Sequence, residues 1–107
     1  MTTHHEQTYA RLVSEYVSSL EGKIGVLDRA LAQAPSDATA LAQARDVAHR
    51  MRGTAGCYGF RELSDAAGLL DESLTALQRG QGSSWDEAVA FAEQVRSVAQ
   101  ATIARRS

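Results

Sequence analysis

Apolar residues recur at spacings of three and four along most of the chain, which is the spacing of one face of an α-helix. The pattern predicts four helices, over about residues 6–34, 37–58, 60–78 and 84–105. The first carries its apolar stripe from Tyr9 to Leu31. Gly22 and Gly25 lie in its middle, and each weakens a helix by up to about 1 kcal/mol, so we expect a bend or a break near them.

Short polar segments separate the expected helices. Pro35 and Asp37 are typical of a helix stop followed by an N-cap, and Ser84 with Glu87 three residues later matches a capping box. Because the connections are short, helices that follow one another should be antiparallel neighbours. The sequence therefore predicts an all-α fold, an antiparallel up-down-up-down four-helix bundle, in a single domain over residues 1–107.

Composition narrows the function classes. The chain is 44% hydrophobic, only 6% aromatic and rich in Ala and Leu, which favours helices over strands. Its net charge of -2 and scattered basic residues give no nucleic-acid footprint. No apolar run approaches the roughly 18 residues of a membrane span, and the N-terminus lacks the order of a signal peptide. Cys57 is the single cysteine, which excludes an intrachain disulfide. We expect a cytoplasmic monomer without nucleic-acid or membrane partners.

Candidate chemistry lies in the second predicted helix, around His49. At about 100° per residue, His49 points about 140° away from the centre of the apolar face and should therefore lie in solvent. The apolar face itself is formed by Leu41, Ala44, Val47, Ala48, Met51 and Ala55. An exposed, neutral imidazole is a competent nucleophile near pH 7.

The neighbours of His49 on its own face follow from spacings of three, four and seven residues. They are Arg45, Asp46, Arg52, Gly53 and Gly56. Each glycine should cost roughly 1 kcal/mol at an exposed helical position, so we interpret the pair as space through which a partner approaches the imidazole. Arg52 can place its guanidinium beside an anion on the ring. We expect Arg45 and Asp46 to belong to a solvated face or to the rim of a docking surface.

The stretch resembles the signature of histidine-containing phosphotransfer (HPt) domains: His, any residue, an apolar residue, Lys or Arg, Gly, and a second Gly ten residues after the His. Here these are His49, Met51, Arg52, Gly53 and Gly59. Residues 53–60 also resemble the phosphoryl-accepting domain of chemotaxis-type histidine kinases. The resemblance implies that His49 is phosphorylated on Nε2, that Arg52 neutralises the phosphate, that Gly53 gives clearance, and that Gly59 allows a turn.

The resemblance also implies the partners. A response-regulator receiver domain would supply the aspartate, the Mg²⁺ and the catalytic groups, and a sensor histidine kinase would feed the pathway. The chain would then be a phosphoryl carrier, not an enzyme, with no cofactor or metal of its own. Two alternatives stay open: the phosphoryl-accepting domain of a larger chemotaxis-like kinase, and a scaffold that binds a receiver without being phosphorylated.

Some residues depart from the family pattern. Arg52 stands where Lys is commoner. The chemotaxis-type branch has a Glu that hydrogen-bonds the His, and the matching position here is Asp71, a shorter acid, which is the candidate His-orienting residue. Gly68 stands where that branch has another polar residue. We further expect Cys57 to be a half-buried filler and Leu69 to contribute to an exposed apolar patch suited to docking.

Overall fold

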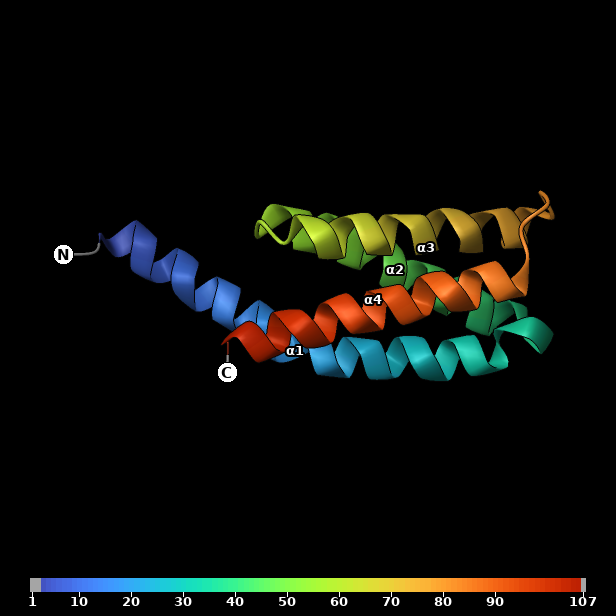
Figure 1. Cartoon of the computed structure of the whole chain (residues 1–107), viewed down its shortest axis with the longest axis horizontal. Coiled ribbons are helices and arrows are strands. Elements are labelled where there is room, and N and C mark those ends of the chain that lie inside the picture. The colour runs from blue at the N-terminus through green and yellow to red at the C-terminus, as the bar shows by residue number, and fades with distance from the viewer. Residues whose placement is uncertain (1–2, 107) are drawn as a thin grey trace.

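A computed structural model describes residues 3–106, and all four expected helices are present (Figure 1). Their bounds are α1 His4–Gln33, α2 Ala38–Cys57, α3 Arg61–Arg79 and α4 Trp85–Arg106, with a 3₁₀ turn, η1, at Ala34–Ser36. The predicted helix ends agree with these bounds to within two residues. The expected single domain also includes Met1, Thr2 and Ser107, which lie outside the described residues.

The helices form an elongated antiparallel bundle of 53 × 21 × 20 Å. Each helix packs against its neighbours in the sequence, and α1 packs against α4 to close the ring (Figure 1). The predicted fold class is therefore confirmed. Within residues 3–106, no helix combines the length and the apolar character that crossing a membrane requires.

Of the bend or break expected in the first helix, the break does not occur, because α1 is helical without interruption from His4 to Gln33. Its buried stripe runs across both glycines through Leu20, Ile24 and Leu27. The free energy of this packing outweighs the low helix propensity of two glycines. Figure 1 shows that the N-terminal turns of α1 extend at a slant beyond the ends of the other helices.

Side chains cap three of the four helices, and those at α2 and α4 are the ones that the sequence predicts. Thr3 and Glu6 form a reciprocal capping box at the start of α1. The Asp37 side chain accepts hydrogen bonds from the first turn of α2. At α4, the Glu87 N–H donates to the Ser84 hydroxyl at 3.1 Å, as the sequence predicts. These caps satisfy backbone N–H groups that would otherwise lack a partner and so fix where each helix begins.

The core combines a few large aliphatic side chains with many alanines. Alanine makes thin contact surfaces, which let the helix axes approach one another closely. Two core residues, Ala48 and Met51, flank His49 in the sequence and are each 1% exposed. Their burial fixes the rotation of α2 about its axis. The largest fully buried side chains are Leu20, Leu27, Met51, Leu63, Leu70, Leu74 and Val95.

An aromatic cluster joins α1 to the end of α2. The Tyr16 ring stacks on Phe60 at 6.1 Å between centroids, and its hydroxyl lies 3.0 Å from that of Thr54 on α2. Burial raises the pKa of Tyr16 above its ordinary value, and the contact with Thr54 opposes this effect. Tyr16 therefore stays uncharged at neutral pH and serves as a packing residue that fixes α1 on α2.

Adjacent leucines on α3 give a matched test of this packing. Leu70 is 0% exposed and Leu69 is 41% exposed. We expect Leu70→Ala to lower the free energy of unfolding by about 2–5 kcal/mol, because it opens a cavity between the helices. Leu69→Ala should change it by no more than about 0.5 kcal/mol. Urea denaturation followed by circular dichroism measures both values, and equal losses would contradict the assigned face of α3.

Candidate functional site

His49 lies on the solvent-facing side of α2, as the sequence predicts. Its side chain is 72% exposed, whereas the neighbouring Ala48 and Met51 are in the core. Two buried neighbours on the opposite face hold the helix so that the imidazole cannot rotate inward without exposing them. The site therefore presents a histidine side chain on a rigid helical surface.

A buried carboxylate on α3 holds one ring nitrogen of His49. Asp71 Oδ2 lies 3.0 Å from His49 Nδ1, and only 9% of the Asp71 side chain is exposed. A carboxylate can only accept hydrogen bonds, so this contact favours the tautomer in which Nδ1 carries the proton. In neutral imidazole the other nitrogen, Nε2, then has a free electron pair. The structure thus brings together His49 and its candidate orienting residue.

Two arginines and a threonine surround the Asp71 carboxylate. Arg52 approaches Oδ2 to 3.8 Å from the turn of α2 after His49, and Arg45 approaches Oδ1 to 4.0 Å from the turn before it. The Thr75 hydroxyl is 3.5 Å from Oδ1. A buried carboxylate is costly without such partners. The cations compensate it while leaving Oδ2 closest to the imidazole.

Arg52 reaches this position because Gly68 leaves room for it on α3. A Cβ atom at Gly68 would lie 3.2 Å from Arg52 Nε and 3.4 Å from its Cδ, closer than most Cβ contacts. The side chain crosses α3 at this point and ends 4.0 Å from Glu72. Gly68 stands where the chemotaxis-type branch has a polar residue. In this chain the absence of a side chain there leaves the space that Arg52 occupies.

The three glycines of the motif have different surroundings. A Cβ atom at Gly53 would meet no other atom within 4 Å, so the space beside it is open. At Gly56 it would come within 3.2 Å of the Ser64 hydroxyl, which donates to the Arg52 carbonyl at 2.7 Å. Gly56 therefore lies against Ser64 of α3, and its expected part in access to His49 stays a prediction. Gly59 has φ +81°, the left-handed conformation that a turn after α2 requires.

A small hollow of about 260 Å³ opens beside the His49 ring. Its lining residues are Ala42, Arg45, Asp46, His49 and Gln78. Arg45 NH1 donates a hydrogen bond to Gln78 Oε1 at 2.8 Å, across α2 and α3. The sequence placed Arg45 in a solvated face or on the rim of a docking surface, and gave no role to Gln78. Only the pairing of α2 with α3 brings these residues together, because they are 33 positions apart.

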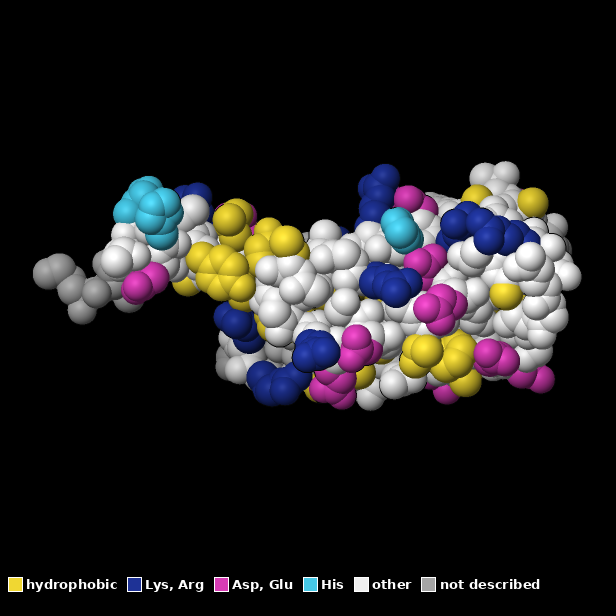
Figure 2. All heavy atoms as spheres, turned by 90° about the horizontal axis from the view of Figure 1, so that it is seen from above, with side chains coloured by type: hydrophobic (Ala, Val, Ile, Leu, Met, Phe, Trp, Pro, Cys, Tyr) yellow, Lys and Arg dark blue, Asp and Glu magenta, His cyan; other side chains and the backbone are white. Residues whose placement is uncertain are grey.

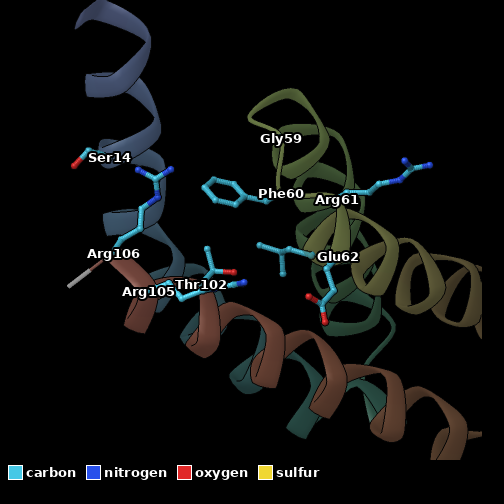
Figure 3. Close-up of a pocket in the computed structure, with 9 residues that line it drawn as sticks. Ser14, Gly59, Phe60, Arg61, Glu62, Thr102, Arg105 and Arg106 are labelled. Carbon is cyan, nitrogen blue, oxygen red and sulfur yellow. The ribbon is translucent and has the colours of Figure 1, made fainter. Parts of the chain in front are cut away.

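A second hollow, of about 670 Å³, lies at one end of the bundle (Figure 3). Figure 3 shows Ser14 of α1 and Arg106 of α4 on one side and Phe60, after the Gly59 turn, on the other. The Arg106 guanidinium lies 5.5 Å from the centre of the Phe60 ring. His49 does not line this hollow, so it is separate from the site on α2 and α3.

Other surface features bear on the sequence predictions. Leu69 is exposed, as expected. Cys57 is exposed as well, which corrects the half-buried filler expected there. On the face seen in Figure 2, basic and acidic side chains are interspersed over the body of the bundle, and hydrophobic side chains gather where the N-terminal turns of α1 leave it. Among residues 3–106, no three His, Cys, Asp or Glu side chains are grouped to hold a metal ion.

The fold and the site define a class of helical bundles that present one histidine, held from behind by an acid and flanked by cations. The sequence model of the Hpt domain matches residues 11–104, and the chain therefore belongs to the Hpt domain family. Domains of this family carry phosphoryl groups in two-component phosphorelays and interact with response regulators and kinases. No curated protein and no solved structure matches the chain significantly.

The contact between Asp71 and His49 can be tested by NMR. In the wild type we expect His49 to be mainly in the Nδ1–H tautomer when neutral, because Asp71 accepts that proton. Asp71→Ala should shift the population toward Nε2–H, which is visible in the ring ¹⁵N chemical shifts. Glu72→Ala removes the adjacent exposed acid and should leave the tautomer unchanged. Identical ring shifts in wild type and Asp71→Ala would contradict the contact.

Proposed function

We propose that this chain accepts a phosphoryl group on Nε2 of His49 and exchanges it with the aspartate of response-regulator receiver domains. The observation that carries the proposal is an imidazole whose Nδ1 faces the buried Asp71 at 3.0 Å while the ring is largely in solvent. This arrangement leaves Nε2 with its electron pair available to a partner. Membership of the Hpt domain family supports the same chemistry.

The proposed transfer starts from the aspartyl phosphate of a receiver. The Nε2 electron pair attacks phosphorus, an N–P bond forms, and the P–O bond breaks so that the receiver aspartate leaves as a carboxylate. Nδ1 keeps its proton throughout, and the ring acquires positive charge. Asp71, 3.0 Å from Nδ1, offsets that charge. The reverse step returns the phosphoryl group to an aspartate, so the chain acts as a carrier.

The remaining groups neutralise charge or permit access. Arg52, which lies 3.8 Å from Asp71, contributes positive charge for the phosphoryl oxygens. The open space beside Gly53 suits the approach of a receiver. The receiver supplies its own Mg²⁺ and catalytic groups, so positioning and charge are what this chain contributes.

His49→Gln tests the assignment of the phosphorylated residue. Wild-type protein incubated with a ³²P-labelled phosphorylated receiver should gain label that is labile in acid and stable in base, as expected of phosphohistidine. His49→Gln should gain none, because glutamine lacks the nucleophilic nitrogen. A His4→Gln, His5→Gln double variant should be labelled like wild type. Label on the His49→Gln variant would place the phosphoryl group elsewhere.

The same assay separates the alternatives. A scaffold that is not phosphorylated would bind the receiver equally well as wild type and His49→Gln, and neither would be labelled. A phosphoryl-accepting domain of a larger kinase would use the same His49 but would be labelled faster by its kinase with ATP than by a phosphorylated receiver. Exchange with receivers is supported if the phosphorylated receiver labels the wild type faster than the receiver loses its phosphate by hydrolysis.

Gly53→Ala distinguishes an effect on the access of a receiver to His49 from an effect on the stability of the fold. Alanine has a higher helix propensity than glycine and meets nothing within 4 Å here, so the variant should gain about 0.5–1 kcal/mol of unfolding free energy. Its phosphotransfer from a receiver should slow by roughly tenfold, equivalent to about 1.4 kcal/mol, because the methyl group intrudes on the docking partner. Gly22→Ala on α1 is the control: it should be stabilised with an unchanged rate. An unchanged rate in Gly53→Ala would contradict the clearance role.

A further inference from the structure

The free space beside His49 lies toward the turn of α2 that precedes it. Side chains on an α-helix lean toward its N-terminus, so a residue covers the turn before its own Cα atom. The hollow beside the imidazole agrees with this direction, since α2 lines it with Ala42, Arg45 and Asp46 as well as His49. Arg52, one turn after His49, lies outside that lining.

Arg45 is held at the edge of this hollow by two contacts from α3. Its NH1 donates to Gln78 at 2.8 Å, and its Nε lies 4.0 Å from Asp71 Oδ1. The side chain is 39% exposed. A guanidinium has five N–H donors, and these contacts engage at most two of them. Arg45 is therefore positioned by the fold and keeps donors for an anion in the hollow.

The positive charge of Arg45 has fewer carboxylates near it than the positive charge of Arg52. Arg52 has two carboxylates within 4.0 Å, from Asp71 and Glu72, whereas Arg45 has Asp71 at 4.0 Å and a neutral amide. Asp46 also lines the hollow, but Arg50 Nε lies 3.2 Å from its Oδ2 and offsets its charge. The positive charge of Arg45 is thus directed at the space that the imidazole borders.

Building on the proposed function, we propose that Arg45 is a second phosphate-neutralising residue and that Gln78 positions it. The phosphoryl group on Nε2 of His49 would lie between two cations, with Arg45 in the turn before the histidine and Arg52 in the turn after it. The motif assigns only Arg52. Arg45 acts on the phosphoryl oxygens directly, whereas Gln78 acts through Arg45.

A small phosphoryl donor tests Arg45 without a docking partner. The 107-residue chain is treated with phosphoramidate, whose P–N bond breaks with loss of ammonia as the bond to His49 forms, and ³¹P NMR follows the product. Arg45→Gln should slow uptake by roughly fivefold, the effect of one unit charge at about 4 Å in water. Arg45→Lys should recover most of the rate, and Gln78→Ala should lie between Arg45→Gln and wild type. Arg11→Gln, which removes an exposed charge on α1, should match wild type.

A second measurement distinguishes a direct role of Arg45 at the phosphoryl group from a structural role. The ³¹P shift of phosphorylated His49, followed against pH, gives the pKa of the phosphoryl group, which a nearby cation lowers because it stabilises the dianion. This pKa should rise in Arg45→Gln and stay unchanged in Arg11→Gln. If wild type is phosphorylated on His49 but Arg45→Gln equals Arg11→Gln in rate and pKa, the role of Arg45 is wrong and the proposed function stands. If wild type takes up phosphate neither here nor from a receiver, both fail.

Discussion

Asp71 is a carboxylate that α3 holds almost entirely out of solvent, and the site depends on how its charge is compensated. Its neighbours are His49, Arg45 and Arg52 of α2 and Thr75 of its own helix. Burying such a group without partners costs several kcal/mol, so the rotation and register of α2 against α3 must bring these partners to it. The same contact fixes one nitrogen of His49, and the other nitrogen takes no part in it.

Close packing of α2 against α3 makes this arrangement possible. Both helices carry buried alanines, Ala44 and Ala48 on α2 and Ala67 on α3, and such small side chains allow a short distance between helix axes. At Gly56 the approach is close enough for the Ser64 hydroxyl to bond a carbonyl of the opposite helix. At Gly68 the missing side chain lets Arg52 lie against α3. Small residues in the interface thus set the positions of the polar groups above it.

The glycines show that one residue type can have different structural roles at positions that look alike in the sequence. Gly53 and Gly56 are both exposed positions near His49 in the sequence, and periodicity alone gives them the same interpretation. In the structure Gly53 borders open space, whereas Gly56 faces Ser64. Gly22 and Gly25 were expected to bend or break α1, yet the buried stripe on either side keeps the helix unbroken. Local propensity is a small term beside tertiary packing.

The sequence by itself determined the four helices, their order and the outward direction of His49, because these follow from periodicity, capping residues and short connections within single segments. It also supplied the motif of His49, Arg52, Gly53 and Gly59. Only the tertiary structure decided that Asp71 meets His49, that Gly68 makes room for Arg52, and that Gln78 holds Arg45 beside the imidazole. The physical reason is that each of these contacts joins α2 to α3. Their geometry is set by the axial register and rotation of two packed helices, which no local pattern encodes.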